Sequence, residues 1–177
     1  LAQIAGRAGR YMQPGTFGVT GEASPLEDGL VEAIQSHAFK PIDRLMWRND
    51  RLDFGSPEAL IASLEAPSTE LQLTKGREAD DLSSLKTLNQ LETVAVRLRD
   101  ARDVKLLWEV CRIPDFQGIS HGEHTTMLAR IFGFLHERGR VDGDWFARQV
   151  KRIDRTDGDI DMLSKRLAYI RTWTYVA

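Results

Sequence analysis

The chain has 177 residues, of which 42% are apolar and 28% charged, the proportions of an ordinary globular protein with room for one good-sized domain. Its 24 basic and 26 acidic residues leave a net charge of −2, so any contact with RNA must come from local basic stripes. No apolar run approaches the roughly 18 residues of a membrane span, and no secretory signal stands at the front, so we expect neither a membrane partner nor secretion.

The first twelve residues are predicted to form a short helix that carries the motif Q-x-x-G-R-x-G-R, in the run from Gln3 to Arg10. On a helix, Gln3, Arg7 and Arg10 fall at i, i+4 and i+7 and share one face. The intervening residues are Ala, Gly and Ile, and Gly6 is one of the fixed positions, so the backbone can approach a partner closely. Guanidinium groups on such a low-profile segment suit the charge that develops on a transferring phosphoryl group. The alternative is that Arg7 and Arg10 are ordinary surface arginines.

The next segment, residues 15–41, is predicted to contain one short strand and one helix. Three glycines in GTFGVTG (residues 15–21) indicate turns around a strand, and phosphate cradling is the weaker interpretation because no strand precedes them. Ser24 and Pro25 are expected to start a helix that ends at Lys40–Pro41. The end of that helix is the first candidate domain boundary.

Residues 42–177 are predicted to be mainly helical. A helix is expected after Ser56–Pro57, a short strand at 69–74, and further helices at about 82–98, at 102–112, after the capping box of Ser120, and after Asp142 or Asp144. The apolar positions Phe146, Val150 and Ile153 are expected to form the buried face of the penultimate helix. A last helix places five residues on one side: Ile160, Leu163, Leu167, Ile170 and Thr174.

Two basic stripes are candidates for RNA contact. The first lies opposite the predicted apolar face of the penultimate helix and consists of Arg148, Lys151, Arg152 and Arg155. The second is diluted by Asp100 and Asp103 and consists of Arg97, Arg99, Arg102 and Lys105. Contacts to phosphate give affinity without sequence preference, although most such stripes are solvated helix faces.

Other reactive or aromatic side chains have simpler explanations. His121, Glu123 and His124 lie together, but capping accounts for Glu123 and a metal needs more ligands, so we expect no metal site. The one cysteine, Cys111, lies in an apolar run and is expected to be buried. A single thiol cannot form an internal disulfide, which favours a reducing compartment. Trp145, at a helix start, is the best candidate for stacking on a base.

The run QIAGRAGR resembles the sixth conserved motif of superfamily-two helicases. The segments VKLLWEVCRIPDF (104–116) and DIDMLSKRLAYIRTWTYVA (159–177) resemble the C-terminal region of the mitochondrial-degradosome RNA helicases and their bacterial relatives. The resemblance implies that residues 1–41 end a second RecA-like domain and that 42–177 form a helical accessory domain beside the nucleic-acid channel. It also implies that Gln3, Gly6, Arg7 and Arg10 contact the nucleotide, with Arg7 and Arg10 as catalytic arginine fingers.

The function expected on this basis is ATP-dependent unwinding of RNA or RNA–DNA duplexes by a longer parent chain. Both ends of the sequence are expected to be cuts, and ATP and Mg²⁺ are expected only in the parent, because G-x-x-x-x-G-K-[ST] is missing here. The fragment alone is therefore expected to be inactive. Its partners would be RNA and the upstream RecA-like domains, in the bacterial cytoplasm or the mitochondrial matrix. The alternative is a helical interaction module that docks a ribonuclease.

Overall fold

The computed structural model describes residues 5–9, 13–21, 23–39, 41–156 and 158–176. The chain divides into two compact units, Leu1–Asp43 (unit 1) and Arg44–Ala177 (unit 2). The described residues are mainly helical, as predicted, with one small two-stranded sheet. None of the helices seen in them is both long and apolar enough to cross a bilayer.

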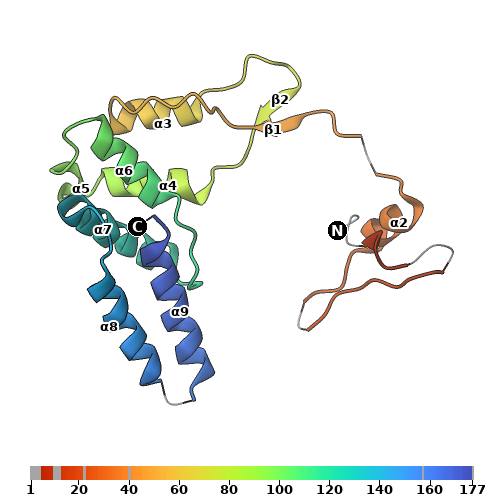
Figure 1. The fold of residues 1–177 in the computed structure, drawn as a ribbon. Helices are drawn as coiled ribbons and strands as arrows, with labels where there is room; N and C mark the ends of the chain where they lie inside the picture. The colour runs from red at the N-terminus through yellow and green to blue at the C-terminus, as the bar shows by residue number, and fades with distance from the viewer. Residues whose placement is uncertain (1–4, 10–12, 22, 40, 157, 177) are drawn as a thin grey trace. The chain divides into compact units, whose positions relative to one another are not determined.

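Unit 1 contains the helix α2 (Asp28–Ser36) (Figure 1). It begins three residues later than Pro25, where the sequence pattern placed the start, because its hydrogen bonding begins at the Glu27 carbonyl, which accepts from the N–H groups of Leu30 and Val31. His37 ends it in a left-handed conformation (φ 54°). The strand predicted within residues 15–21 is absent from the described residues, since no backbone neighbour is hydrogen-bonded to that segment there.

Unit 2 begins with a parallel strand pair joined through a helix. The strands β1 (Leu45–Trp47) and β2 (Leu73–Lys75) pair in register, with Leu45 opposite Leu73, and α3 (Pro57–Glu65) connects them. The predicted start of α3 is confirmed, since the Ser56 hydroxyl accepts the N–H of Ala59 at 3.1 Å. The strand β1 was not predicted, and β2 begins four residues after Thr69, where a strand was expected.

The centre of unit 2 is built by α4 (Asp80–Asn89), α6 (Ala101–Cys111) and α7 (His121–Arg138), with α3 and α5 (Glu92–Ala95) packed on them. The single helix expected over 82–98 is broken into α4 and α5 by Leu91, whose backbone is extended. In one continuous helix Val94 would lie about 240° around the axis from Leu88. The break lets both side chains enter the core, where each is at most 1% exposed.

Local capping fixes the ends of the longest helix. The Ser120 hydroxyl accepts the Glu123 N–H, and the Glu123 carboxylate accepts the Ser120 N–H at 3.1 Å, which confirms the predicted capping box. Bonds from the Ser120 hydroxyl and backbone N–H hold the pKa of Glu123 below its ordinary value. Gly139, in a left-handed conformation (φ 78°), ends α7 as predicted.

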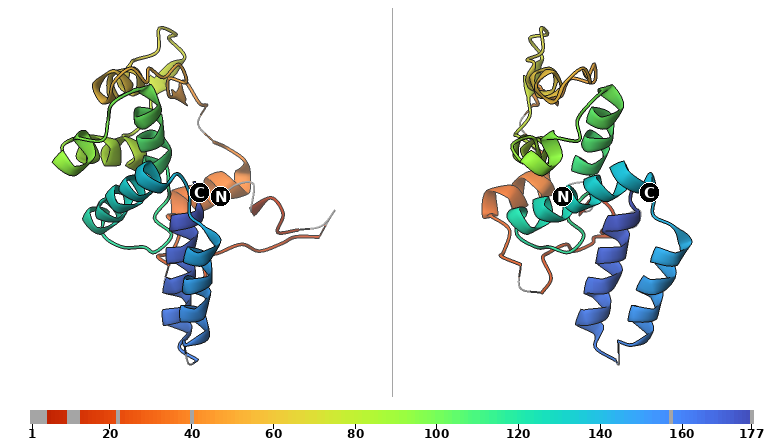
Figure 2. Two further views of the ribbon diagram at one scale, coloured as in Figure 1. Left: turned by 60° about the vertical axis from the view of Figure 1, so that its left-hand side comes forward. Right: turned by 90° about the vertical axis from the view of Figure 1, so that its left-hand side faces the viewer.

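The helices α8 (Gly143–Asp154) and α9 (Ile160–Thr174) form an antiparallel hairpin that extends away from α7 in both views of Figure 2. Asp142 caps α8 by accepting the Trp145 N–H at 2.7 Å. The predicted buried face of α8 is wrong: Phe146 and Val150 are 48% and 37% exposed, whereas Trp145 and Gln149 are buried. Trp145 decides the orientation, because its ring packs on Tyr169 and Trp173 of α9.

The same hairpin leaves much of the predicted apolar side of α9 in solvent. Ile160 is 79% exposed and Leu167 is 50% exposed, while Thr172 and Trp173 are the buried residues of the helix. Trp173 also meets Phe134 of α7 edge-on, with ring centroids 5.6 Å apart. The base of the hairpin is thus anchored in the core, and its outer part is not.

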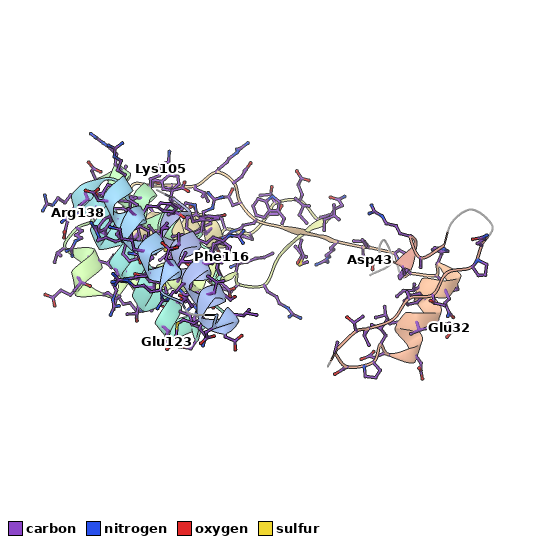
Figure 3. All side chains as sticks on the ribbon, turned by 60° about the horizontal axis from the view of Figure 1, so that its bottom comes forward. Glu32, Asp43, Lys105, Phe116, Glu123 and Arg138 are labelled. Carbon is purple, nitrogen blue, oxygen red and sulfur yellow. The ribbon has the colours of Figure 1, made fainter. Side chains whose placement is uncertain are left out.

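We expect amide hydrogen exchange to be slowest in α6 and α7 and much faster in unit 1. Figure 3 shows side chains crowded among the helices of unit 2 and sparser around α2. Among the described residues of unit 1, Ile34 is the one buried apolar side chain, whereas unit 2 has a continuous core. Exchange measured by mass spectrometry with peptide resolution checks this; equal protection of α2 and α7 would contradict it.

Candidate functional site

The arginine motif lies in a tight turn in the described part of unit 1. Ala5 is the last helical residue, Gly6 and Arg7 form a turn closed by the Ala8 N–H on the Ala5 carbonyl at 2.9 Å, and Arg7 is exposed. Of the helix predicted for residues 1–12, the described residues 6–9 are therefore not helical. A continuous helical face for the motif is not observed, because the chain turns at Gly6.

Gly15 accounts for the compactness of this segment. A Cβ at Gly15 would overlap the carbonyl group of Ala8, so a side chain there would push the following loop off the motif. Gly15 thus lies directly against the turn that presents Arg7. Gln3 and Arg10 lie outside the described residues.

The basic stripe on α8 divides into two pairs. Arg148 and Lys151 are exposed and do not line the cavity between α8 and α9. Arg152 and Arg155 instead line a cavity of about 470 Å³ between α8 and α9. Lys165 and Arg166 of α9 complete the basic lining of this cavity and were not singled out from the sequence. They come opposite Arg152 only when α8 and α9 are paired antiparallel. The remaining lining residues are Gln149, Tyr169 and Ile170.

One residue of the second basic stripe, Arg97, is engaged within the fold. Arg97 pairs with Glu137 at 2.8 Å and also donates to the Thr93 carbonyl. The hydrogen bond and charge of Arg97 lower the pKa of the Glu137 carboxyl. Arg102 is 95% exposed at its side chain and lies 3.9 Å from Asp100. Arg97 is therefore held within the fold, whereas Arg99, Arg102 and Lys105 are exposed.

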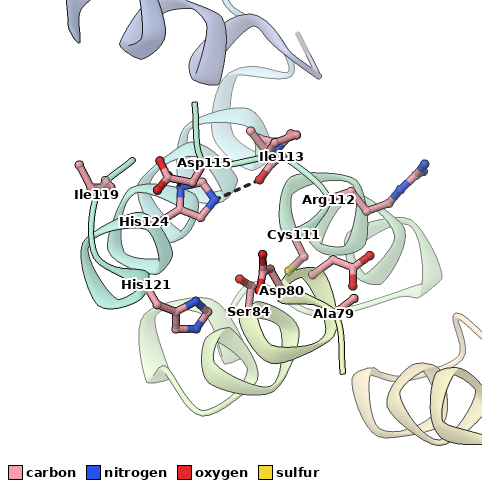
Figure 4. A pocket seen from close by; sticks show the side chains of 12 residues that line it. Ala79, Asp80, Ser84, Cys111, Arg112, Ile113, Asp115, Ile119, His121 and His124 are labelled. Atoms are coloured by element: carbon pink, nitrogen blue, oxygen red, sulfur yellow. Dashed lines mark hydrogen bonds and ion pairs between the residues drawn. The ribbon is translucent and has the colours of Figure 1, made fainter. Parts of the chain in front are cut away.

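His121 and His124 face a cavity of about 590 Å³ that is also lined by Asp80, Cys111 and Asp115 (Figure 4). The His124 Nε2 donates to the Ile113 carbonyl at 3.0 Å, which fixes the hydrogen on that nitrogen. Its Nδ1 lies 4.0 Å from the Asp115 carboxylate. In the described ranges, no three His, Cys, Asp or Glu side chains come together in a way that could hold a metal ion.

Trp145 is corrected as a stacking candidate. It is 8% exposed, and its ring stacks on Tyr169 at 6.4 Å and an interplanar angle of 23°. Trp173 covers it further, with ring centroids 5.7 Å apart. A base would have to displace these neighbours, so Trp145 belongs to the hairpin's own packing.

Cys111 is expected to resist thiol reagents in the native protein. It is 3% exposed, and burial raises the pKa of its thiol, with the charge of Asp81 adding to the shift, so the reactive thiolate is rare. Reaction with Ellman's reagent should be slow in buffer and rapid in denaturant. Rapid stoichiometric labelling of the folded protein would contradict the burial.

No protein-family model, curated protein or solved structure matches this chain.

Proposed function

We propose that the chain is the C-terminal part of an ATP-dependent RNA helicase, with unit 1 supplying arginine fingers and unit 2 a helical domain that flanks the nucleic acid. The observation that carries the proposal is the Q-x-x-G-R-x-G-R motif of residues 3–10. Five fixed positions at average residue usage should occur by chance in fewer than roughly one in a million windows. The motif also resembles that of a helicase in spacing and composition.

The chemistry of the arginines supports this interpretation. In phosphoryl transfer, negative charge spreads over the γ-phosphate oxygens, and catalysis depends mainly on positioning and electrostatic stabilisation. A guanidinium group keeps its charge and presents a planar donor fork to those oxygens. Arg7 projects from a glycine-framed turn and is exposed, as a residue that reaches a nucleotide on another domain must be.

The nucleotide itself would be held by residues outside this chain. None of the 177 residues forms the glycine-rich phosphate-binding loop with its lysine, which cradles ATP and helps to place Mg²⁺. The proposed activity therefore belongs to a longer protein with two RecA-like domains. The fragment contributes Gln3, Gly6, Arg7 and Arg10 to a composite site.

The deciding experiment is ATP hydrolysis by the full-length protein with and without single-stranded RNA, together with unwinding of an RNA duplex. The proposal expects RNA to stimulate hydrolysis, and unwinding to require ATP. The 177-residue chain by itself is expected to hydrolyse no ATP. A full-length protein without RNA-stimulated hydrolysis would refute the proposal.

A second candidate function is docking of a ribonuclease, and the exposed apolar side chains of the hairpin favour it. Phe146, Ile160 and Leu167 are 48%, 79% and 50% exposed, so the hairpin offers apolar area to a partner. Calorimetric titration with purified candidate exoribonucleases tests this role. Binding should be lost in Ile160→Asp and kept in a control with Ser164→Asp, a change at an exposed polar position of the same helix.

A further inference from the structure

The cavity between α8 and α9 is lined by basic side chains without a carboxylate. Arg152 and Arg155 contribute from the end of α8, and Lys165 and Arg166 contribute from α9, around a volume of about 470 Å³. No aspartate or glutamate lines this cavity in the described part of the chain. The four positive charges therefore face one hollow without internal compensation.

Several basic residues elsewhere in unit 2 are paired with carboxylates. Arg48 forms two hydrogen bonds to Asp81 at 2.8 and 2.9 Å, and Lys86 lies 2.7 Å from both Glu65 and Glu78. In the part of the chain that the structure describes, none of Arg152, Arg155, Lys165 and Arg166 forms an ion pair. Gathering like charges is unfavourable unless an anion offsets it.

Arg166 adds an independent indication. Its Nη1 is buried from solvent and has no hydrogen-bond partner among the described residues. A buried guanidinium nitrogen without an acceptor is costly, and structures rarely keep one without a reason. An anionic oxygen in the cavity would supply the acceptor.

The geometry points to a phosphate group as the ligand of this cavity, and we propose that the backbone of single-stranded RNA provides it. Three guanidinium forks and one ammonium match the several oxygens and the charge of a phosphate better than the two oxygens of a carboxylate. Tyr169 lines the same cavity, but its ring already stacks on Trp145. It therefore forms part of the cavity wall and is not free to stack on a base. The choice of RNA rests on the proposed function; the choice of phosphate does not.

The test uses the 177-residue chain, fluorescently labelled oligouridine and inorganic phosphate. Arg155→Gln/Lys165→Gln removes two charges from the cavity at exposed side chains, so folding should be kept. Arg130→Gln/Arg140→Gln removes two charges from exposed positions outside the cavity and outside both candidate stripes, and is the matched control. We expect the cavity variant to raise the Kd for RNA about tenfold or more and to lower the salt slope by about 0.7 for each phosphate that the variant no longer binds. The control should stay within about twofold.

A local readout separates the possible sources of the phosphate. Titration with inorganic phosphate should shift the Nε–Hε resonances of Arg152 and Arg166 in the wild type. Loss of both RNA and phosphate binding in the cavity variant supports the proposal in full. Phosphate binding without an effect on RNA supports the cavity as a site for a free phosphate ligand and overturns its role in RNA binding. If neither ligand responds to the cavity variant, the proposal is wrong.

Phosphate binding by the cavity is independent of the helicase assignment. Binding of phosphate by the 177-residue chain requires no ATP hydrolysis, so the cavity can hold its ligand even if the full-length protein is not a helicase. Conversely, the cavity variant of the full-length protein could keep both its RNA affinity and its RNA-stimulated ATP hydrolysis. That result would be consistent with the proposed function and would show that the cavity plays no part in it.

Discussion

Replacing Arg7 or Arg10 by alanine is expected to lower ATP turnover by the full-length protein about 10³-fold or more while ATP still binds. The arginines are proposed to act on charge that develops as the γ-phosphate is transferred, so their loss should affect kcat more than nucleotide affinity. Arg7 is exposed and lies in a turn, so its replacement removes no packing that the structure shows. The prediction therefore concerns catalysis and not folding.

The measurement is steady-state hydrolysis at saturating RNA, paired with binding of a fluorescent ATP analogue. Arg102→Ala is the control, because its side chain is 95% exposed in unit 2 and has no proposed contact with the nucleotide. It should hydrolyse ATP at the rate of the wild type. Normal turnover in both motif variants would show that Arg7 and Arg10 are surface residues, and the helical unit as a binding module would become the better account.

Phe132→Ala is expected to lower the free energy of unfolding of unit 2 by about 3–5 kcal/mol. Phe132 is 0% exposed and lies in α7, in the core that this helix forms with α4 and α6. Truncation removes buried apolar area and leaves a cavity that the surrounding helices can fill only in part. Urea denaturation followed by far-UV circular dichroism measures the change.

Phe146→Ala is the matched control for this truncation. The same side chain is removed from the next helix, but Phe146 is 48% exposed, so we expect a change of about 0.5 kcal/mol or less. Similar losses for the two variants would mean that α8 buries Phe146 and not Trp145. That result would contradict the packing of the hairpin described above.

Local sequence signals predicted those helix ends that are fixed by capping interactions with nearby backbone groups. Ser56, Ser120 and Gly139 were each identified from the sequence, and Asp142 was one of two candidates beside Asp144, because capping depends on residues only a few positions apart. The break at Leu91 escaped prediction, because it follows from where Leu88 and Val94 must point in the core. The strand β1 escaped for a similar reason: three residues pair in parallel with a segment 28 positions later, Leu45 with Leu73, and nothing local marks them.

The candidate sites divide in the same way. Arg7 could be singled out because the motif around it is contiguous, although the turn at Gly6 was not expected. The cavity of the hairpin could not be found, because Lys165 and Arg166 join Arg152 only through the pairing of α8 with α9. The buried side of α8 was misassigned because Phe146 lies in an apolar stripe with Val150 and Ile153, whereas Trp145 shares its side of the helix with the polar Gln149. Only contact with α9 selects the side of Trp145.

The aromatic stack at the base of the hairpin gives this part of the molecule an optical signature. Trp145 and Trp173 lie 5.7 Å apart, and Tyr169 touches both, with centroids 6.4 and 6.0 Å away. Indole transitions held at such separations couple, so the pair should dominate the near-ultraviolet circular dichroism of the chain. Since Tyr169 also lines the basic cavity, that band would report occupancy directly, without any attached dye.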